Sequence, residues 1–225
     1  MKPRSSNQRN HALTLVEVLV GIVVVVTLVI ICLLPSLRQA KMTAQRVSCN
    51  GNLKGIGLSF RVWEGDHGGK SPMQISVTNG GTMELADGNN AWINFAVMSN
   101  ELSSPRIVIC PADKTRFYAA NFSTDFDNSK VSYFEGLDAI EPEPSTYLYS
   151  QRLLSGDENF AIRGVPAKPG LLELTTNCQI TWTSARHQFI GNIGMADGSV
   201  GEIRTTGLQQ AIQNTGLATN RLAIP

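Results

Sequence analysis

Residues Leu13–Leu34 read LTLVEVLVGIVVVVTLVIICLL, and this stretch decides how the chain is organised. The run is almost wholly apolar, carries one charged residue (Glu17), and ends at Pro35. A helix rises about 1.5 Å per residue, so the run reaches about 33 Å, enough to cross a bilayer core of about 30 Å. Because no face of it is polar, the sequence predicts a membrane-spanning helix rather than the core helix of a soluble domain.

Glu17 is the one costly residue in this run. A carboxylate inside a membrane helix costs about 2.5–3.5 kcal/mol on insertion scales, and such residues are usually functional. Glu17 lies close to the start of the run, however, where its side chain can also reach back to the lipid headgroups. Its position alone leaves both interpretations open.

The residues before the run form a short basic leader without acidic side chains, in which the basic residues are Lys2, Arg4, Arg9 and His11. An ordinary signal peptide has an apolar core of about 7–15 residues followed by its small-residue cleavage site. Here the small residue, Ala12, precedes the apolar run. The ordinary signal-peptide interpretation is therefore excluded.

The segment Ala12–Glu17 (ALTLVE) resembles the processing site of type IV pilins and type II secretion pseudopilins. In that family a basic leader is followed by Gly, Phe and Thr-Leu-x-Glu, so Ala12 and Leu13 depart from the usual Gly and Phe. The resemblance implies that a prepilin peptidase cuts between Ala12 and Leu13 and methylates the new amino terminus at Leu13. It also implies that Glu17 is retained for assembly.

The chain is predicted to have four parts: a leader at 1–12, a span at 13–35, an amphipathic helical half at 36–63 and a globular part at 64–225. In the amphipathic half, apolar residues recur three and four positions apart, which predicts one face packed on the globular part. That face comprises Leu37, Ala40, Ala44, Val47, Cys49, Leu53, Ile56, Phe60 and Trp63. Glycines at 51, 55 and 57 weaken the helix by about 1 kcal/mol each or let another backbone approach it. The stretch Gly65–Gly69 is predicted to end the helix.

The globular part shows short, strand-like segments between turns. Strands are predicted at 106–110, 131–134, 147–154 and 179–183, with a turn at 155–157 and a short helix at 91–99. The predicted fold class is α+β, a long amino-terminal helix packed on a small antiparallel sheet. The resemblance implies that this fold is type IV pilin-like.

The cysteines leave several pairings open. A bridge between Cys49 and Cys110 is the predicted disulfide, but either thiol can instead pair with Cys178 or stay free. The chain has no CxxC pair and no Cys/His cluster with zinc-ligand spacing, so no metal site is predicted. Calcium is a weak alternative, since some pseudopilins hold it in a loop, but no EF-hand spacing occurs here.

His187 precedes Asp197-Gly198 at the end of the chain. Strands at 189–195 and 199–204 flank this Asp-Gly pair, which is a strong signal for a two-residue hairpin turn. An extended strand of ten residues covers about 30 Å, so His187 and Asp197 are not expected to meet, and a structural role is favoured over catalysis. This part resembles the prepilin-associated H-X9-DG domain, through His187, Gly191-Asn192 and Asp197–Val200.

No catalytic signature such as GxSxG, HExxH or a P-loop is present, so the chain is not expected to be an enzyme. Its net charge of +1 gives no reason to expect a nucleic-acid partner. The resemblance implies a pseudopilin-like subunit that assembles with other pseudopilins, with a prepilin peptidase, an inner-membrane assembly platform and membrane lipid as partners. It would be a single-pass inner-membrane protein with its amino terminus in the cytoplasm and its domain outside. The alternative is a membrane-anchored extracytoplasmic binding module that never assembles.

Overall fold

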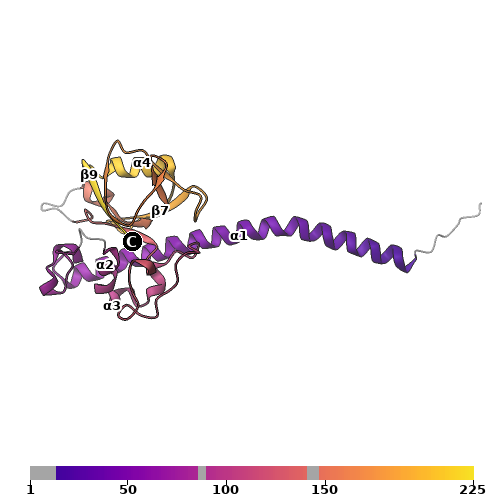
Figure 1. Ribbon diagram of the computed structural model, residues 1–225, viewed down its shortest axis with the longest axis horizontal. Coiled ribbons are helices and arrows are strands. Elements are labelled where there is room, and N and C mark those ends of the chain that lie inside the picture. Colours follow the sequence, from indigo (N-terminus) through magenta and orange to yellow (C-terminus); the bar gives the residue numbers. More distant parts are fainter. Residues whose placement is uncertain (1–13, 86–89, 141–146) are drawn as a thin grey trace, which may run out of the picture. The chain divides into compact units, whose positions relative to one another are not determined.

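The computed structural model describes residues 14–85, 90–140 and 147–225, and the chain forms two units, Met1–Lys41 and Met42–Pro225 (Figure 1). Helix α1 (Leu15–Asp66) contributes to both and continues through Pro35. From Leu15 to Leu34, within the first unit, α1 is apolar on every side, and none of its apolar window is buried. By length and composition it is able to cross a membrane, as the sequence predicts.

The second unit is built on an antiparallel sheet of six strands in the order β5-β9-β1-β2-β7-β8. A smaller sheet has the order β4-β3-β6. The strands are β1 (Tyr133–Gly136), β2 (Leu153–Asp157), β3 (Phe160–Ile162), β4 (Val165–Pro166), β5 (Gly170–Thr175), β6 (Ile180–Trp182), β7 (Ile190–Met195), β8 (Val200–Arg204) and β9 (Thr219–Ile224). This unit has the predicted α+β architecture.

Short helices complete the second unit. They are α2 (Ala91–Val97), α3 (Ser99–Leu102) and α4 (Thr205–Asn214), with the 3-10 turns η1 (Pro72–Gln74), η2 (Val77–Asn79), η3 (Pro105–Val108), η4 (Asn128–Lys130) and η5 (Tyr147–Gln151). The predicted helix at 91–99 corresponds to α2 and the start of α3. The predicted stop of the long helix is also observed, because α1 ends at Asp66 and Gly68 and Gly69 follow with positive φ.

Two apolar cores lie on opposite faces of the large sheet, because neighbouring strand residues point to opposite sides. On β1, Tyr133 belongs to the core shared with α1 and α2, whereas Phe134 belongs to the core shared with β6 and α4. The second half of α1 and the helix α4 therefore cover different faces (Figure 1). The α1 residues buried in this way are Cys49, Leu53, Ile56, Gly57, Ser59, Phe60 and Trp63.

The predicted apolar face of α1 is correct from Cys49 onward and wrong just before it. Ala44 and Val47 are exposed. In this part the helix instead makes polar contacts: Gln45 Nε2 donates to the Pro111 carbonyl at 2.9 Å, and Arg46 pairs with Glu202 at 3.2 Å. The edge of the domain is polar here, so a polar side of the helix faces it.

The predicted strand at 106–110 is wrong, because Pro105–Val108 forms the 3-10 turn η3. Ser104 accepts a hydrogen bond from the Arg106 backbone N–H, and Pro105 occupies the first turn. Both are helix-start signals that outweigh the β-branched residues of this segment.

The strand predicted at 147–154 and the turn predicted at 155–157 are also wrong in their bounds. Residues 147–151 form η5, and β2 runs from Leu153 to Asp157. Leu153 pairs with Met195, the last residue of β7, so residues before Leu153 have no β7 residue to pair with. Gly156 is used for close packing rather than for a turn, since a Cβ there would lie 2.7 Å from the Phe134 ring. The strands predicted at 131–134 and 179–183 correspond to β1, shifted toward the carboxyl end, and to β6.

Candidate functional site

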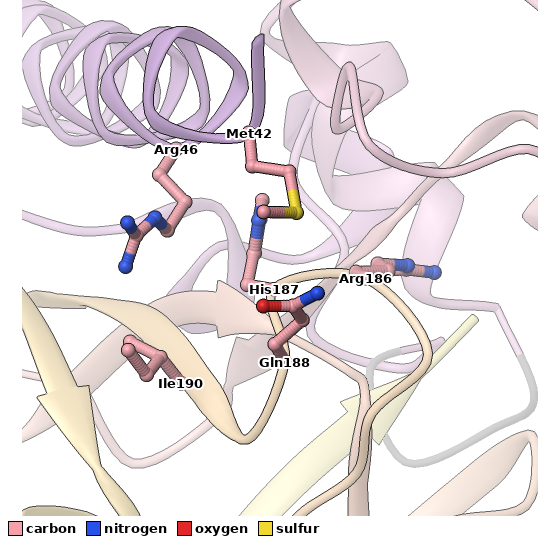
Figure 2. Close-up of a pocket in the computed structure, with 6 residues that line it drawn as sticks. All are labelled: Met42, Arg46, Arg186, His187, Gln188 and Ile190. Atoms are coloured by element: carbon pink, nitrogen blue, oxygen red, sulfur yellow. The ribbon is translucent and has the colours of Figure 1, made fainter. Parts of the chain in front are cut away.

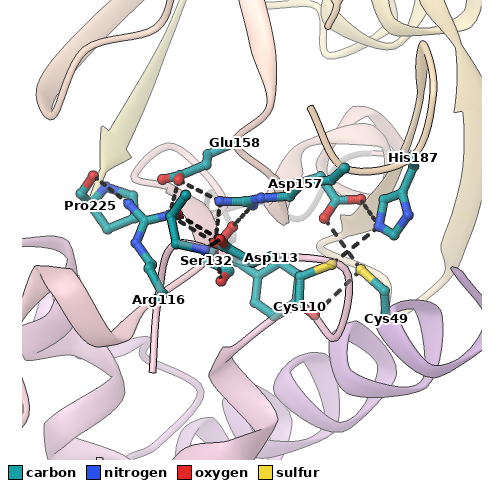
Figure 3. Close-up of polar contacts among 12 residues, drawn as sticks. Cys49, Cys110, Asp113, Arg116, Ser132, Asp157, Glu158, His187 and Pro225 are labelled. Carbon is teal, nitrogen blue, oxygen red and sulfur yellow. Dashed lines mark hydrogen bonds and ion pairs between the residues drawn. The ribbon is translucent and has the colours of Figure 1, made fainter. Parts of the chain in front are cut away.

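Four side chains with metal-ligating or nucleophilic atoms meet between α1 and the large sheet: Cys49, Cys110, Asp157 and His187 (Figure 3). Their ligand atoms all lie within 4.8 Å of one another. The two cysteines and Asp157 are fully buried, and His187 is 4% exposed. Each residue comes from a different segment of the second unit.

Cys49 is the first buried residue of the α1 face that packs on the domain. Its thiol donates to Asp157 Oδ1 at 3.2 Å, and the Tyr133 hydroxyl donates to its sulfur at 3.3 Å. Tyr133 is also fully buried. The Cys49 sulfur is therefore oriented from two sides.

Cys110 follows the turn η3 and is followed by Pro111. Nearby, Asn52 of α1 donates from Nδ2 to the Ile109 carbonyl at 3.0 Å, and the Ser132 N–H donates to the Val108 carbonyl at 2.9 Å. These bonds attach the segment to α1 and to the start of β1. They hold Cys110 Sγ 3.2 Å from Nε2 of His187.

Asp157 ends strand β2 and faces the helix side of the sheet. Asn192 of β7 donates to Asp157 Oδ2 twice, from its backbone N–H at 2.8 Å and from Nδ2 at 3.1 Å. The carboxylate oxygen Oδ1 is left facing Cys49. His187 Nε2 lies 3.6 Å from Oδ2.

His187 lies just before β7, and the two residues after it have unusual backbone conformations. Gln188 and Phe189 have φ of 54° and 64°, in the left-handed region that non-glycine residues seldom adopt. The strand predicted at 189–195 is therefore one residue too long at its start, since β7 begins at Ile190. The bend turns His187 inward, and strain of this kind is concentrated at sites where the surrounding structure holds a side chain in place.

The four groups also perturb one another electrostatically. Burial raises the pKa of the Cys49 thiol, and its contact with Cys110 and the charge of Asp157 raise it further. The hydrogen bond with Cys49 lowers the pKa of Cys110 to about 6. Burial raises this pKa, and the hydrogen bond with His187 lowers it further. Burial disfavours the charged imidazole, but the bond with Cys110 and the carboxylate of Asp157 outweigh it, so the pKa of His187 is raised. Cys110 is thus the thiol that ionises more readily.

An ion-pair network lies beside the four residues (Figure 3). Arg186 Nη2 lies 2.6 Å from both Asp113 Oδ2 and Glu158 Oε1, and Arg186 Nη1 donates to the Ser132 carbonyl at 2.6 Å. Arg116 pairs with the same two carboxylates. Arg186 and Glu158 directly neighbour His187 and Asp157 in sequence, so this network holds the backbone that carries them.

The other predicted site residues lie elsewhere. Ala12 and Leu13 fall outside the described residues. Glu17 lies in the first turn of α1, where its Oε2 accepts from the Thr14 backbone N–H at 2.8 Å and the Thr14 hydroxyl at 2.9 Å. The Glu17 N–H in turn donates to the Thr14 hydroxyl at 3.3 Å, which makes a capping box.

Asp197 and Gly198 lie at the turn between β7 and β8, which pair as the predicted hairpin. The turn has three residues rather than two: Met195 N–H donates to the Ser199 carbonyl, Gly198 N–H donates to the Met195 carbonyl, and Gly198 has φ of 82°. A Cβ at Gly57 would lie 3.6 Å from Gly198 Cα, so the turn lies close against α1. Gly57 is thus one of the α1 glycines that let another backbone approach the helix. His187 and Asp197 occupy different surroundings.

No sequence pattern indicates this cluster of four residues, because its members are far apart in the chain. Cys49 and Asp157 are 108 positions apart, and Cys110 and His187 are 77 apart. The thiols of Cys49 and Cys110 are adjacent and free in the structure. Two thiols, an imidazole and a carboxylate are donors able to hold a metal ion, although no motif spacing indicated it.

Comparisons of the chain with protein families, with curated proteins and with solved structures found no match. The likeness to pilins therefore rests on the short motifs at 12–17 and 187–200.

Proposed function

We propose that this protein is a pseudopilin-like structural subunit, which loses its leader between Ala12 and Leu13 and assembles through α1 into a filament of the type II secretion or type IV pilus kind. The observation that carries the proposal is the part of α1 from Leu15 to Leu34. It is apolar on every side, unburied, and carries its one acidic side chain in the first turn.

An apolar surface of this size needs a partner, either lipid or other helices. Large side chains from Leu15 to Leu34 point outward all round the helix and are 48–82% exposed. Lipid would cover them in the membrane and neighbouring subunits would cover them in a filament. One surface then serves both states, which is the behaviour expected of a subunit that leaves the membrane to assemble.

Glu17 has a specific role in this proposal. Cleavage would place a new amino group at Leu13, directly before the Thr14 that Glu17 already contacts. In a filament, the carboxylate of one subunit would neutralise the amino terminus of a neighbour inside the apolar core. The rival role is helix capping alone, which needs an acceptor oxygen but no charge.

The partners follow from this scheme: a prepilin peptidase, other pseudopilin subunits, an inner-membrane assembly platform and lipid. The amino terminus would face the cytoplasm and the second unit would lie outside, with a structural rather than catalytic role. The alternative, an anchored binding module that never assembles, leaves the basic leader without a use and gives Glu17 a capping role that needs no charge.

Glu17→Gln is the decisive variant, because Gln keeps the capping acceptor and removes the charge. Processed protein would be compared with wild type by cross-linking and by filament shearing. We expect normal cleavage and insertion but weakened assembly, since an uncompensated buried amino group costs about 3–5 kcal/mol. Thr27→Val is a matched control, because it alters a polar side chain on the same helical half without changing charge. Assembly of the Gln variant at the wild-type level would show that Glu17 only caps the helix.

A further inference from the structure

The structure assigns a second property to this chain, independent of assembly. We propose that Cys49, Cys110, Asp157 and His187 bind one Zn²⁺ ion in a closed tetrahedral site that fastens α1 to the sheet.

The spacing of the donor atoms fits tetrahedral zinc. With zinc bonds of about 2.3 Å to sulfur and about 2.0–2.1 Å to nitrogen or oxygen, ligand atoms of a tetrahedron lie about 3.3–3.8 Å apart. The observed separations are 3.2 Å from Cys49 Sγ to Asp157 Oδ1 and 3.2 Å from Cys110 Sγ to His187 Nε2, and the ligand atoms of all four residues lie within 4.8 Å of one another. Small side-chain adjustments would therefore complete the site.

The chemical types of the donors select the metal. Two thiolates with an imidazole suit zinc, whereas calcium and magnesium require oxygen ligands almost throughout. All four ligands come from the protein and all are buried, which is typical of a structural zinc site rather than a catalytic one with an open position.

The surrounding residues orient these ligands as second-sphere groups do in zinc sites. Asn192 holds Asp157 Oδ2 with two hydrogen bonds, which leaves Oδ1 beside Cys49 as the oxygen to bind the ion. The Tyr133 hydroxyl donates to the Cys49 sulfur. Two thiolates, one carboxylate and a neutral imidazole around Zn²⁺ would give the site one net negative charge. The hydrogen-bond donors of Asn192 and Tyr133 point toward this charge.

Access to the site is available beside His187. A small pocket of about 60 Å³ is lined by Met42 and Arg46 of α1 and by Arg186, His187, Gln188 and Ile190 (Figure 2). Of the four proposed ligands, His187 is among the residues that line this pocket. An ion would enter by displacement of His187 and be retained on its return.

A Cys49–Cys110 disulfide is the rival explanation for the two adjacent thiols. It uses two of the four donors and leaves a fully buried carboxylate and an imidazole to compensate each other. Zinc engages all four groups at once. Because they come from α1, the segment after η3, the end of β2 and the bend before β7, its binding energy would contribute directly to folding.

The test uses the full chain in detergent, purified without a metal-affinity tag, chelator or reductant. We expect about one zinc per chain by mass spectrometry of metals. Thiol titration in denaturant with chelator should find all four cysteines reactive, against two if Cys49 and Cys110 are joined. Replacement of zinc by Co²⁺ should give the thiolate charge-transfer and tetrahedral ligand-field absorption bands. Removal of zinc should lower the unfolding midpoint by at least about 5 °C.

Cys110→Ser and Asp157→Asn should each reduce bound zinc at least about tenfold, because loss of a ligand weakens the site. Cys178→Ser, outside the cluster, should keep it. The wild-type metal content and cobalt spectrum decide the question even where a variant does not fold. Wild-type protein without zinc, whether with two or four free thiols, overturns the proposal, and so does zinc that both ligand variants retain in full.

Discussion

The sulfur of Cys110 lies 3.2 Å from Nε2 of His187, although 77 positions separate the two residues in the chain. The sequence predicts Cys110 as a disulfide partner of Cys49, and it predicts a structural role for His187 in the strands around Asp197-Gly198. Their contact places both in a single buried cluster between α1 and the sheet. The cluster therefore joins α1 to the segment after η3, to the end of β2 and to the bend before β7.

Processing of the leader can be tested directly. Co-expression with a prepilin peptidase should shorten the chain by twelve residues and add a methyl group at Leu13, as measured by intact mass. Ala12→Phe should block the cut without preventing insertion, because a large side chain replaces the small residue at the cleavage site. Ala44→Phe, on the exposed side of α1, should be cut normally. Retention of Met1 in the wild type under these conditions would contradict the prediction.

Glu135 should make the stability of the second unit depend on pH. Its carboxyl group is fully buried and accepts one hydrogen bond from Asn94 Nδ2 at 2.5 Å. Burial raises its pKa to about 8. Because this is above the ordinary value of 4.5, the stability it contributes is complete below pH 4.5 and is lost as pH rises through 8. The loss is on the order of 3–5 kcal/mol.

Denaturant unfolding followed by tryptophan fluorescence from pH 5 to 9 would measure this effect, since Trp63, Trp92 and Trp182 all lie in the second unit. Glu135→Gln should remove most of the decline in unfolding free energy toward pH 9. The exposed Glu173→Gln should leave it unchanged. An equal decline in wild type and Glu135→Gln would show that another group is responsible.

Asp113 should protect the fold against acid. Burial disfavours its charge, but Arg186 and hydrogen bonds from Thr115 and Ser132 outweigh this and lower its pKa to about 2. The stability it contributes is present above the ordinary value of 3.8 and is lost as pH falls through 2. Asp113→Asn should cost about 2–3 kcal/mol at neutral pH, because it leaves Arg186 with Glu158 as its remaining carboxylate partner. The exposed Asp66→Asn is the control, and equal unfolding free energies for the two variants would refute the assignment.

Gly191 should not tolerate a side chain. A Cβ at this position in β7 would overlap the ring of Trp182, which is itself buried. Gly191→Ala should therefore destabilise the second unit by about 1–3 kcal/mol through overpacking. Gly201→Ala, in the neighbouring strand β8, meets only a side-chain carbon of Ile203 at 3.9 Å and should be close to neutral. Thermal unfolding of both variants is the measurement, and an unchanged midpoint for Gly191→Ala would contradict the close packing.

The sequence by itself determined the elements that depend on neighbouring residues. The apolar run at 13–34, the buried face from Cys49 to Trp63, the helix stop after Asp66 and the β7–β8 hairpin all follow from periodicity or turn chemistry within a short window. Such patterns depend on the local geometry of helices and strands, so no knowledge of the rest of the chain is needed.

Only the tertiary structure decided where the strands begin and which donors meet. Asp157, assigned to a turn from its Ser-Gly-Asp context, is the end of a buried strand, because β2 takes its position from β7. The meeting of Cys49, Cys110, Asp157 and His187 depends on the packing of α1, the turn η3, the order of strands in the sheet and the bend at Gln188 and Phe189. Each of these depends on contacts between distant segments, and the physical reason the cluster escaped the sequence is that no local pattern encodes such contacts.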